Sequence, residues 1–188
     1  MKKELVLASA SPRRRELLEQ LGLSFSVRVA DIDESRLPGE TPEMLVQRLA
    51  AGKAKAAFRT GEVVVAADTV VAVDGTVLGK PKDADDAVRM LKMLSGRSHF
   101  VYTGICVFDG VTTVSETVAT EVTFIPMSDE EIHRYIASGE PLDKAGAYGI
   151  QGLAARYISG IRGDHYNVVG LPVCRLSNVL KNSFSFDF

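Results

Sequence analysis

Residues 63–73, Val-Val-Val-Ala-Ala-Asp-Thr-Val-Val-Ala-Val, are the stretch that most strongly limits the fold. The run is rich in valine and shows no helical period, which is typical of a strand buried on both faces. Asp74-Gly75 follows as a tight-turn signal into a short strand at residues 76–78. Together with the helix signals on both sides of it, this strand argues for α/β or α+β layers.

Helix signals stand on both sides of this strand. Ser11-Pro12 and Thr41-Pro42 are N-caps followed by proline, and they predict helices to about Gly22 and Phe58. Asp83 predicts a helix to about Gly96, and Ser128 with Glu131 forms a capping box for a helix to about Ser138. A last helix is expected from Pro172 to about Asn182. Strands are expected at residues 4–8, 100–108, 111–125, 156–161 and 167–169, and an irregular, glycine-rich segment at residues 141–152.

Composition excludes several function classes. The 188 residues carry 22 Lys plus Arg against 24 Asp plus Glu, a formal net charge of −2. A nucleic-acid-binding module would need a surplus of cations, so we expect no nucleic-acid partner. The apolar run at residues 63–73 is too short to span a membrane and contains an aspartate. With two cysteines lacking metal-ligand spacing and no export signal, we expect a cytoplasmic protein with reduced thiols, forming a single domain over residues 1–188.

The first candidate site is the segment Ser9-Ala10-Ser11-Pro12-Arg13-Arg14-Arg15. Cations in the first turn of a helix oppose the helix dipole, while the free N–H groups of that turn attract anions. A bound phosphate would resolve the conflict, with arginine forks and a serine hydroxyl as donors. A solvated arginine cluster behind an ordinary cap explains the same residues.

Asp68 and Lys53 are the next candidates. An ionised carboxylate inside a buried strand is costly unless it meets cations, a metal or several donors; Asp68 could also simply accept backbone N–H bonds. Lys53 follows Leu45 and Leu49 at steps of four and so lies on the apolar face of its helix, whereas Lys55 lies on the wet face. It could reach an anion, or extend along the core boundary to solvent.

Two glycine-containing segments suggest phosphate or base contacts without matching a standard motif. Lys80, between Gly79 and Pro81, lacks the spacing of a Walker A loop but could still contact phosphate; an exposed loop lysine is the ordinary alternative. In the segment at residues 146–152 no strand feeds a dinucleotide fingerprint. Gln151 could there present a donor and an acceptor to a base edge, or simply be solvated.

Taken in order, these segments resemble the Maf family of nucleoside triphosphate pyrophosphatases over nearly the whole chain. The matching segments are residues 7–14 (Leu-Ala-Ser-Ala-Ser-Pro-Arg-Arg), 66–71 (Ala-Ala-Asp-Thr-Val-Val), 79–81 (Gly-Lys-Pro), 94–99 (Leu-Ser-Gly-Arg-Ser-His), 103–104 (Thr-Gly), 141–152 (Pro-Leu-Asp-Lys-Ala-Gly-Ala-Tyr-Gly-Ile-Gln-Gly) and 170–172 (Gly-Leu-Pro). The resemblance implies an α/β fold like that of the inosine triphosphate pyrophosphatases: an elongated mixed sheet, flanking helices, and two lobes around a nucleotide cleft. It also implies a homodimer and a divalent metal, Mg²⁺ or Mn²⁺.

The resemblance also assigns roles to residues. Asp68 matches the aspartate that accepts the proton of the attacking water. Arg13, Thr69 and Gln151 match positions associated with base choice, and they read as in the branch acting on dTTP and UTP; the branch preferring 7-methyl-GTP typically has Trp, Gln and Glu there. Hydrolysis at the α-phosphorus would give a monophosphate and pyrophosphate.

Further residues are expected to complete this site. Ser9, Arg14, Lys53 and Lys80 would bind the triphosphate, and Glu34 with Asp68 would hold the metal. Glu34 could equally be an exposed loop acid, and Asp143 with Lys144 are weaker candidates that could form a surface pair. A nucleotide-binding regulator of septum formation with little turnover is the alternative function, but such a sensor would not need the inward aspartate.

Overall fold

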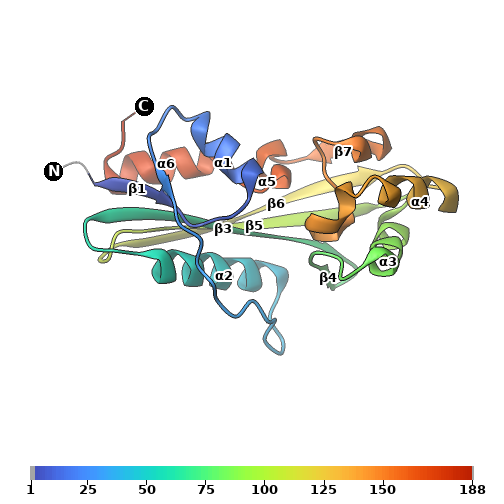
Figure 1. Cartoon of the computed structure of the whole chain (residues 1–188), viewed down its shortest axis with the longest axis horizontal. Coiled ribbons are helices and arrows are strands. Elements are labelled where there is room, and N and C mark those ends of the chain that lie inside the picture. Colours follow the sequence, from blue (N-terminus) through green and yellow to red (C-terminus); the bar gives the residue numbers. More distant parts are fainter. Residues whose placement is uncertain (1–2, 188) are drawn as a thin grey trace. The chain divides into compact units, whose positions relative to one another are not determined.

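The computed structural model describes residues 3–187 (Figure 1). Its strands are β1 (Glu4–Leu7), β2 (Ser26–Val27), β3 (Glu62–Val73), β4 (Thr76–Leu78), β5 (Ser98–Phe108), β6 (Thr113–Phe124) and β7 (Ile158–Arg162). Its α-helices are α1 (Pro12–Glu19), α2 (Pro42–Ala57), α3 (Ala84–Leu94), α4 (Asp129–Ala137), α5 (His165–Val169) and α6 (Val173–Phe184). Three short 3₁₀ helices are η1 (Glu140–Asp143), η2 (Ala145–Ala147) and η3 (Leu153–Tyr157). The mixed α/β class expected from the sequence is confirmed.

All seven described strands form one mixed sheet. The order is β2-β1-β3-β5-β6-β7, and β4 pairs with β3 away from this path. Strand β1 is parallel to β2 and β3, whereas the β3–β4 and β6–β7 pairs are antiparallel. The tight turn between β3 and β4 is the predicted one, with Asp74 and Gly75 both at positive φ. The valine-rich strand β3 therefore occupies an interior position, as its two-sided burial required.

The chain divides into two compact units, each built from separate segments. The first unit comprises the residues up to Asp68, Thr103–Val118 and the residues from Gly170 onward; the second comprises Thr69–Tyr102 and Ala119–Val169. The expectation of one domain without a separable linker stays a prediction.

In the first unit, helices cover both faces of the strands. Figure 1 shows α2 on one side and α1 with α6 on the other. Small residues of α2, Ala50, Ala54 and Ala57, pack with valines of β1 and β3 in a fully buried cluster. Gly104 of β5 lies so close to α2 that a Cβ atom there would be 2.5 Å from the Val46 carbonyl oxygen. The small side chains therefore allow this helix to pack closely against the sheet.

In the second unit, the core lies between α3, α4 and the strands. It includes Leu91 and Leu94 of α3, Ile132 and Tyr135 of α4, and Phe124 of β6. Helix α4 begins at the predicted capping box, in which Ser128 and Glu131 bond each other's backbone N–H groups. This packing supports the 3₁₀ helices that follow α4.

One predicted element is wrong and one is displaced. Residues 167–169 are not a strand but the end of α5, because the buried Asn167 side chain donates to Val101 O and Thr120 Oγ1 and fixes a helical turn there. The strand predicted at residues 156–161 begins at Ile158 and runs to Arg162, since residues 153–157 form η3. The two-residue strand β2 was not expected, because Ser26–Val27 is too short for a periodic signal.

Within residues 3–187, no helix combines the length and apolarity needed to cross a membrane.

Candidate functional site

Asp68, Lys53 and Glu34 form the centre of the candidate site in the first unit. Lys53 Nζ lies 2.6 Å from Asp68 Oδ1 and 2.8 Å from Glu34 Oε1. The side chains of Lys53 and Asp68 are each only 11% exposed, whereas that of Glu34 is 60% exposed. One ammonium thus joins two carboxylates, one buried on β3 and one on a loop before α2.

The position of Lys53 follows from the helical phase of α2. Leu49 and Leu45, one and two turns earlier, are buried against the core, while Lys55 is exposed. Lys53 therefore leaves the apolar face of α2 and donates to the Asp68 carboxylate. Asp68 in turn accepts from a side-chain cation, which offsets the unfavourable free energy of burying its charge in a strand.

The loop that carries Glu34 is held to α2 by a pair that the sequence analysis missed. Arg48 donates to both carboxylate oxygens of Glu40 at 2.6 and 2.9 Å and to the Ser35 carbonyl at 2.9 Å. The hydrogen bonds from Arg48 lower the pKa of Glu40 to about 2, so the pair stays charged at neutral pH. A pair eight residues apart across a helix start has no periodic signature, so no sequence signal marked it.

The start of α1 brings Ser9 and Arg14 into the same unit. Ser11 caps α1 by accepting from the Arg14 N–H, and the buried Ser9 hydroxyl accepts from the Ser11 N–H at 3.2 Å. The Arg14 side chain turns back, with Nε donating to the Gly170 carbonyl at 2.8 Å and Nη1 to Ser9 Oγ at 3.4 Å. The cap and the arginine are thus part of one hydrogen-bonded corner.

The arginine cluster divides into inward and outward members. Burial lowers the pKa of the Arg14 guanidinium; Asp68 and Glu34 oppose that shift, while the neighbouring Arg13 adds to it. Arg14 therefore lies within electrostatic range of both carboxylates. Arg15 is exposed and pairs with Glu19 one turn along α1. The solvated-cluster interpretation fits Arg15 but not Arg14.

The remaining predicted residues, Thr69, Lys80 and Gln151, belong to the second unit. Thr69 is half-buried on β3. Lys80 is exposed, and the preceding Gly79 carbonyl accepts from the Gly146 N–H at 3.0 Å. Gln151 is exposed in a turn of the glycine-rich segment. The lysine loop and the glycine-rich segment are therefore joined within this unit.

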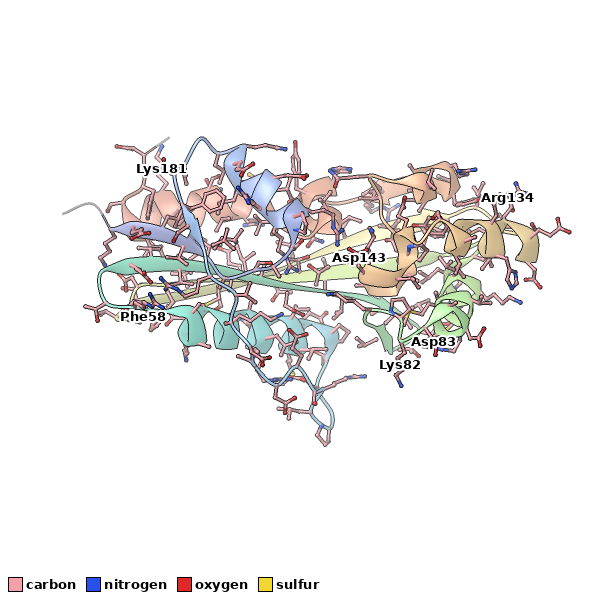
Figure 2. All side chains as sticks on the ribbon, viewed as in Figure 1. Phe58, Lys82, Asp83, Arg134, Asp143 and Lys181 are labelled. Carbon is pink, nitrogen blue, oxygen red and sulfur yellow. The ribbon has the colours of Figure 1, made fainter. Side chains whose placement is uncertain are left out.

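The weaker candidates, Asp143 and Lys144, form the ion pair that the surface interpretation predicted. Their charged atoms lie 2.6 Å apart, and Lys144 Nζ also donates to the Glu140 carbonyl at 2.7 Å. Figure 2 labels Asp143 on the segment that follows α4. Lys144 thus helps to fix the backbone of η1.

The carboxylates converge without forming a complete metal cage. Within residues 3–187 there is no group of three or more His, Cys, Asp or Glu side chains arranged to hold a metal ion. Asp68 and Glu34 nevertheless direct one oxygen each at the same Lys53 nitrogen. Two carboxylates with substrate phosphate oxygens are a ligand set that Mg²⁺ accepts, so the residues fit a cation that arrives with a phosphate ligand.

Taken together, this corner offers what phosphoryl hydrolysis requires. Arg14 and Lys53 are cations that can neutralise phosphate oxygens, and Asp68 is a buried carboxylate beside them that can accept a proton from water. The catalytic and binding roles of the individual residues stay predictions.

Comparisons with known proteins agree with the observed fold. A HAM1 protein from Coxiella burnetii has a similar fold, with a TM-score of 0.54 at 21% identity, covering 96% of this chain and 100% of that chain. This match confirms the expected fold. A protein from Anaeromyxobacter dehalogenans (strain 2CP-C) named dTTP/UTP pyrophosphatase is 52% identical over 187 residues, covering 97% of this chain and 95% of its own.

A protein of the same name from Geobacter sp. (strain M21) is 54% identical over 181 residues, covering 94% of each chain. The family model described as Maf-like protein matches residues 4–183. That span includes every segment of the site described above, and the chain belongs to the Maf family.

Proposed function

We propose that this chain is a nucleoside triphosphate pyrophosphatase that hydrolyses dTTP and UTP. The observation that carries the proposal is near-full-length identity of 52% and 54% with relatives named dTTP/UTP pyrophosphatase. The cluster of Arg14, Lys53 and Asp68 in the first unit supports it, because it combines phosphate-binding cations with a buried carboxylate.

The proposed reaction is attack of water on the α-phosphorus. The water oxygen forms a bond to the α-phosphorus, the bond from that phosphorus to the oxygen bridging to the β-phosphate breaks, and pyrophosphate leaves with the bonding electrons. Asp68 takes the proton of the water, and Arg14, Lys53 and Lys80 neutralise the triphosphate and the leaving group. Ser9 supplies a hydroxyl at the phosphate-binding corner. The products are the nucleoside monophosphate and pyrophosphate.

Asp68 and Glu34 would hold a divalent cation, Mg²⁺ or Mn²⁺, together with substrate phosphate oxygens. When bound, the ion would supply charge neutralisation and a lower pKa for a coordinated water. Lys53, which bonds both carboxylates in this structure, would then be released to bond a phosphate oxygen. When no nucleotide is bound, the Lys53 ammonium thus offsets the negative charges of Asp68 and Glu34.

Base choice is proposed to rest on Arg13, Thr69 and Gln151. The glutamine side-chain amide offers a carbonyl acceptor and N–H donors, which match the imide N–H and a carbonyl oxygen on the edge of uracil or thymine. The proposal further includes a homodimer in the cytoplasm, as the family resemblance implies.

The test uses the purified protein with Mg²⁺ or Mn²⁺ and a panel of canonical and modified nucleoside triphosphates. We expect pyrophosphate and monophosphate in equal amounts, with dTTP and UTP preferred over 7-methyl-GTP. The reverse ranking would overturn the assigned branch, and a nucleotide that binds without turnover would favour the regulator.

A matched pair of variants tests the role of Asp68. Asp68→Asn should abolish hydrolysis while nucleotide binding stays measurable. Asp74→Asn makes the same change at an exposed aspartate that pairs with Arg97 beyond the end of β3, and it should leave turnover unchanged. Near-normal turnover of Asp68→Asn would refute its role as the base.

A further inference from the structure

The turn that carries Gln151 is held at both ends by two side chains from the segment around α4. At its start, the Gly149 N–H donates to the Tyr135 hydroxyl at 3.1 Å. At its end, the Leu153 N–H donates to Glu140 Oε2 at 2.9 Å. The Tyr135 hydroxyl in turn donates to Glu140 Oε1 at 2.8 Å, so the two holding groups are bonded to each other.

The glycines of the turn make this close approach possible. A Cβ atom on Gly152 would lie 2.3 Å from both carboxylate oxygens of Glu140, and one on Gly149 would lie 2.8 Å from Lys144 Cε. The Gly152 N–H donates to the Gly149 carbonyl at 3.1 Å and closes the turn. The carboxylate of Glu140 therefore lies directly against the backbone of residues 149–152, in space that only glycine leaves open.

The hydrogen bonds have a fixed direction. Burial raises the pKa of Tyr135, and the hydrogen bond to Glu140 raises it further, so the hydroxyl stays protonated at neutral pH. Its one hydrogen goes to Glu140, which leaves its lone pairs to accept from Gly149. Both oxygens of Glu140 are likewise used as acceptors. Each group has one arrangement that satisfies it, so the turn is held in one conformation.

Gln151 itself is exposed in the middle of this held turn. If the backbone around Gln151 became ordered only on binding, the conformational entropy lost at that step would weaken the affinity for a base. Holding both ends of the turn beforehand removes that cost. Because both groups bond the backbone of the turn on either side of Gln151, their effect is expected on base recognition.

We propose that Tyr135 and Glu140 are positioning residues for nucleobase selection, which act by fixing the turn that presents Gln151 to the pyrimidine. The inference rests on the proposed function and on the role of Gln151 within it. Neither side chain touches the substrate in this proposal. Both affect specificity by fixing the turn.

The test is Tyr135→Phe, which deletes the hydroxyl and keeps the buried ring. Deleting the hydroxyl removes its hydrogen bonds to Glu140 and from Gly149, and it should raise KM for dTTP and UTP about three- to tenfold while kcat stays within about twofold. The preference for dTTP and UTP over 7-methyl-GTP should narrow by the same factor. Tyr157→Phe removes a hydroxyl from the same core without touching the turn's amides, and it should leave KM and selectivity unchanged.

A double variant separates positioning from a general structural effect. In a Gln151→Ala background, Tyr135→Phe should cause no further change in KM or in selectivity, because the group it positions is gone. A further loss as large as that in the wild-type background would overturn the inference. Hydrogen exchange of the Gly149 and Leu153 amides should also be faster in Tyr135→Phe than in Tyr157→Phe.

The outcomes for the inference and for the proposed function differ. Wild-type protein that fails to hydrolyse dTTP or UTP would overturn both. Wild-type turnover with Tyr135→Phe behaving like Tyr157→Phe would overturn the inference alone. Should Tyr135→Phe not fold, Glu140→Gln serves instead, since its single carbonyl oxygen can replace only one of the two carboxylate acceptors; unchanged KM and selectivity there would overturn the inference equally.

Discussion

Replacing Lys53 with methionine tests whether the ammonium between the carboxylates is structurally important. Methionine keeps the length and the apolar stem of the side chain, so the packing along α2 is retained while the charge is lost. Asp68 would then stand as a buried carboxylate without the cation that lies 2.6 Å away in the native protein. The protein should be less stable, because a buried charge without its partner is strongly unfavourable.

The magnitude follows from burial and from the neighbouring charges. Removing one partner of a fully buried ion pair costs about 3–5 kcal/mol. Asp68 is 11% exposed, and Arg14 remains as a second cation near it, so we expect a loss of about 2–3 kcal/mol in the free energy of unfolding. Adding Asp68→Asn to Lys53→Met removes the unpaired charge and should restore more than half of that loss.

The assay is urea unfolding at pH 7 followed by circular dichroism. Lys55→Met is the matched control, since Lys55 is exposed on the same helix and its loss should change the unfolding free energy by less than about 0.5 kcal/mol. The reasoning is refuted if Lys53→Met is as stable as Lys55→Met, or if the Lys53 and Asp68 effects simply add in the double variant.

Two further predictions concern the packing and the pH dependence of the fold. Gly104→Ala should lower the unfolding free energy by about 2–3 kcal/mol, because the new methyl group would lie 2.5 Å from the Val46 carbonyl; Gly160→Ala, with open space around its Cβ, is the control in urea unfolding. His99 is buried, and burial lowers its pKa to about 4. Between pH 6.5 and 4 this histidine is therefore protonated in the unfolded chain but neutral in the folded one. The contribution of His99 to the free energy of unfolding should therefore be complete above pH 6.5 and fall by about 3 kcal/mol between pH 6.5 and 4. His99→Phe should flatten that pH dependence, while His133→Phe should not.

These two predictions have plain contrary outcomes. A Gly104→Ala protein that unfolds at the same urea concentration as Gly160→Ala would mean that α2 does not pack as closely as described. An unfolding free energy whose pH slope is unchanged in His99→Phe would mean that the histidine does not stay neutral in the folded protein.

The parts of the fold that the sequence predicts well are those with a strong local pattern. A signal within a few residues is enough to predict each of three features: the valine run of β3, the turn at Asp74 and the capping box at Ser128. Residues 167–169 failed because two valines favour a strand locally, whereas the tertiary hydrogen bonds of Asn167 decide for a helix.

The candidate site divides in the same way. Helical phase alone separates Lys53 from Lys55, since the two lie on different faces of one helix. Nothing in the spacing of the chain brings Glu34 to Lys53, because a loop without periodicity carries it there. The hydrogen bonds of Glu140 to the turn after it are equally invisible, since the approach depends on missing Cβ atoms in three dimensions.

The most direct test of the account measures the products formed from dTTP and UTP with Mg²⁺ by the wild-type protein and by Asp68→Asn. We expect one pyrophosphate and one monophosphate per nucleotide consumed by the wild-type protein, and binding without turnover by the variant. Release of inorganic phosphate with a diphosphate product, or equal turnover by both proteins, would contradict it.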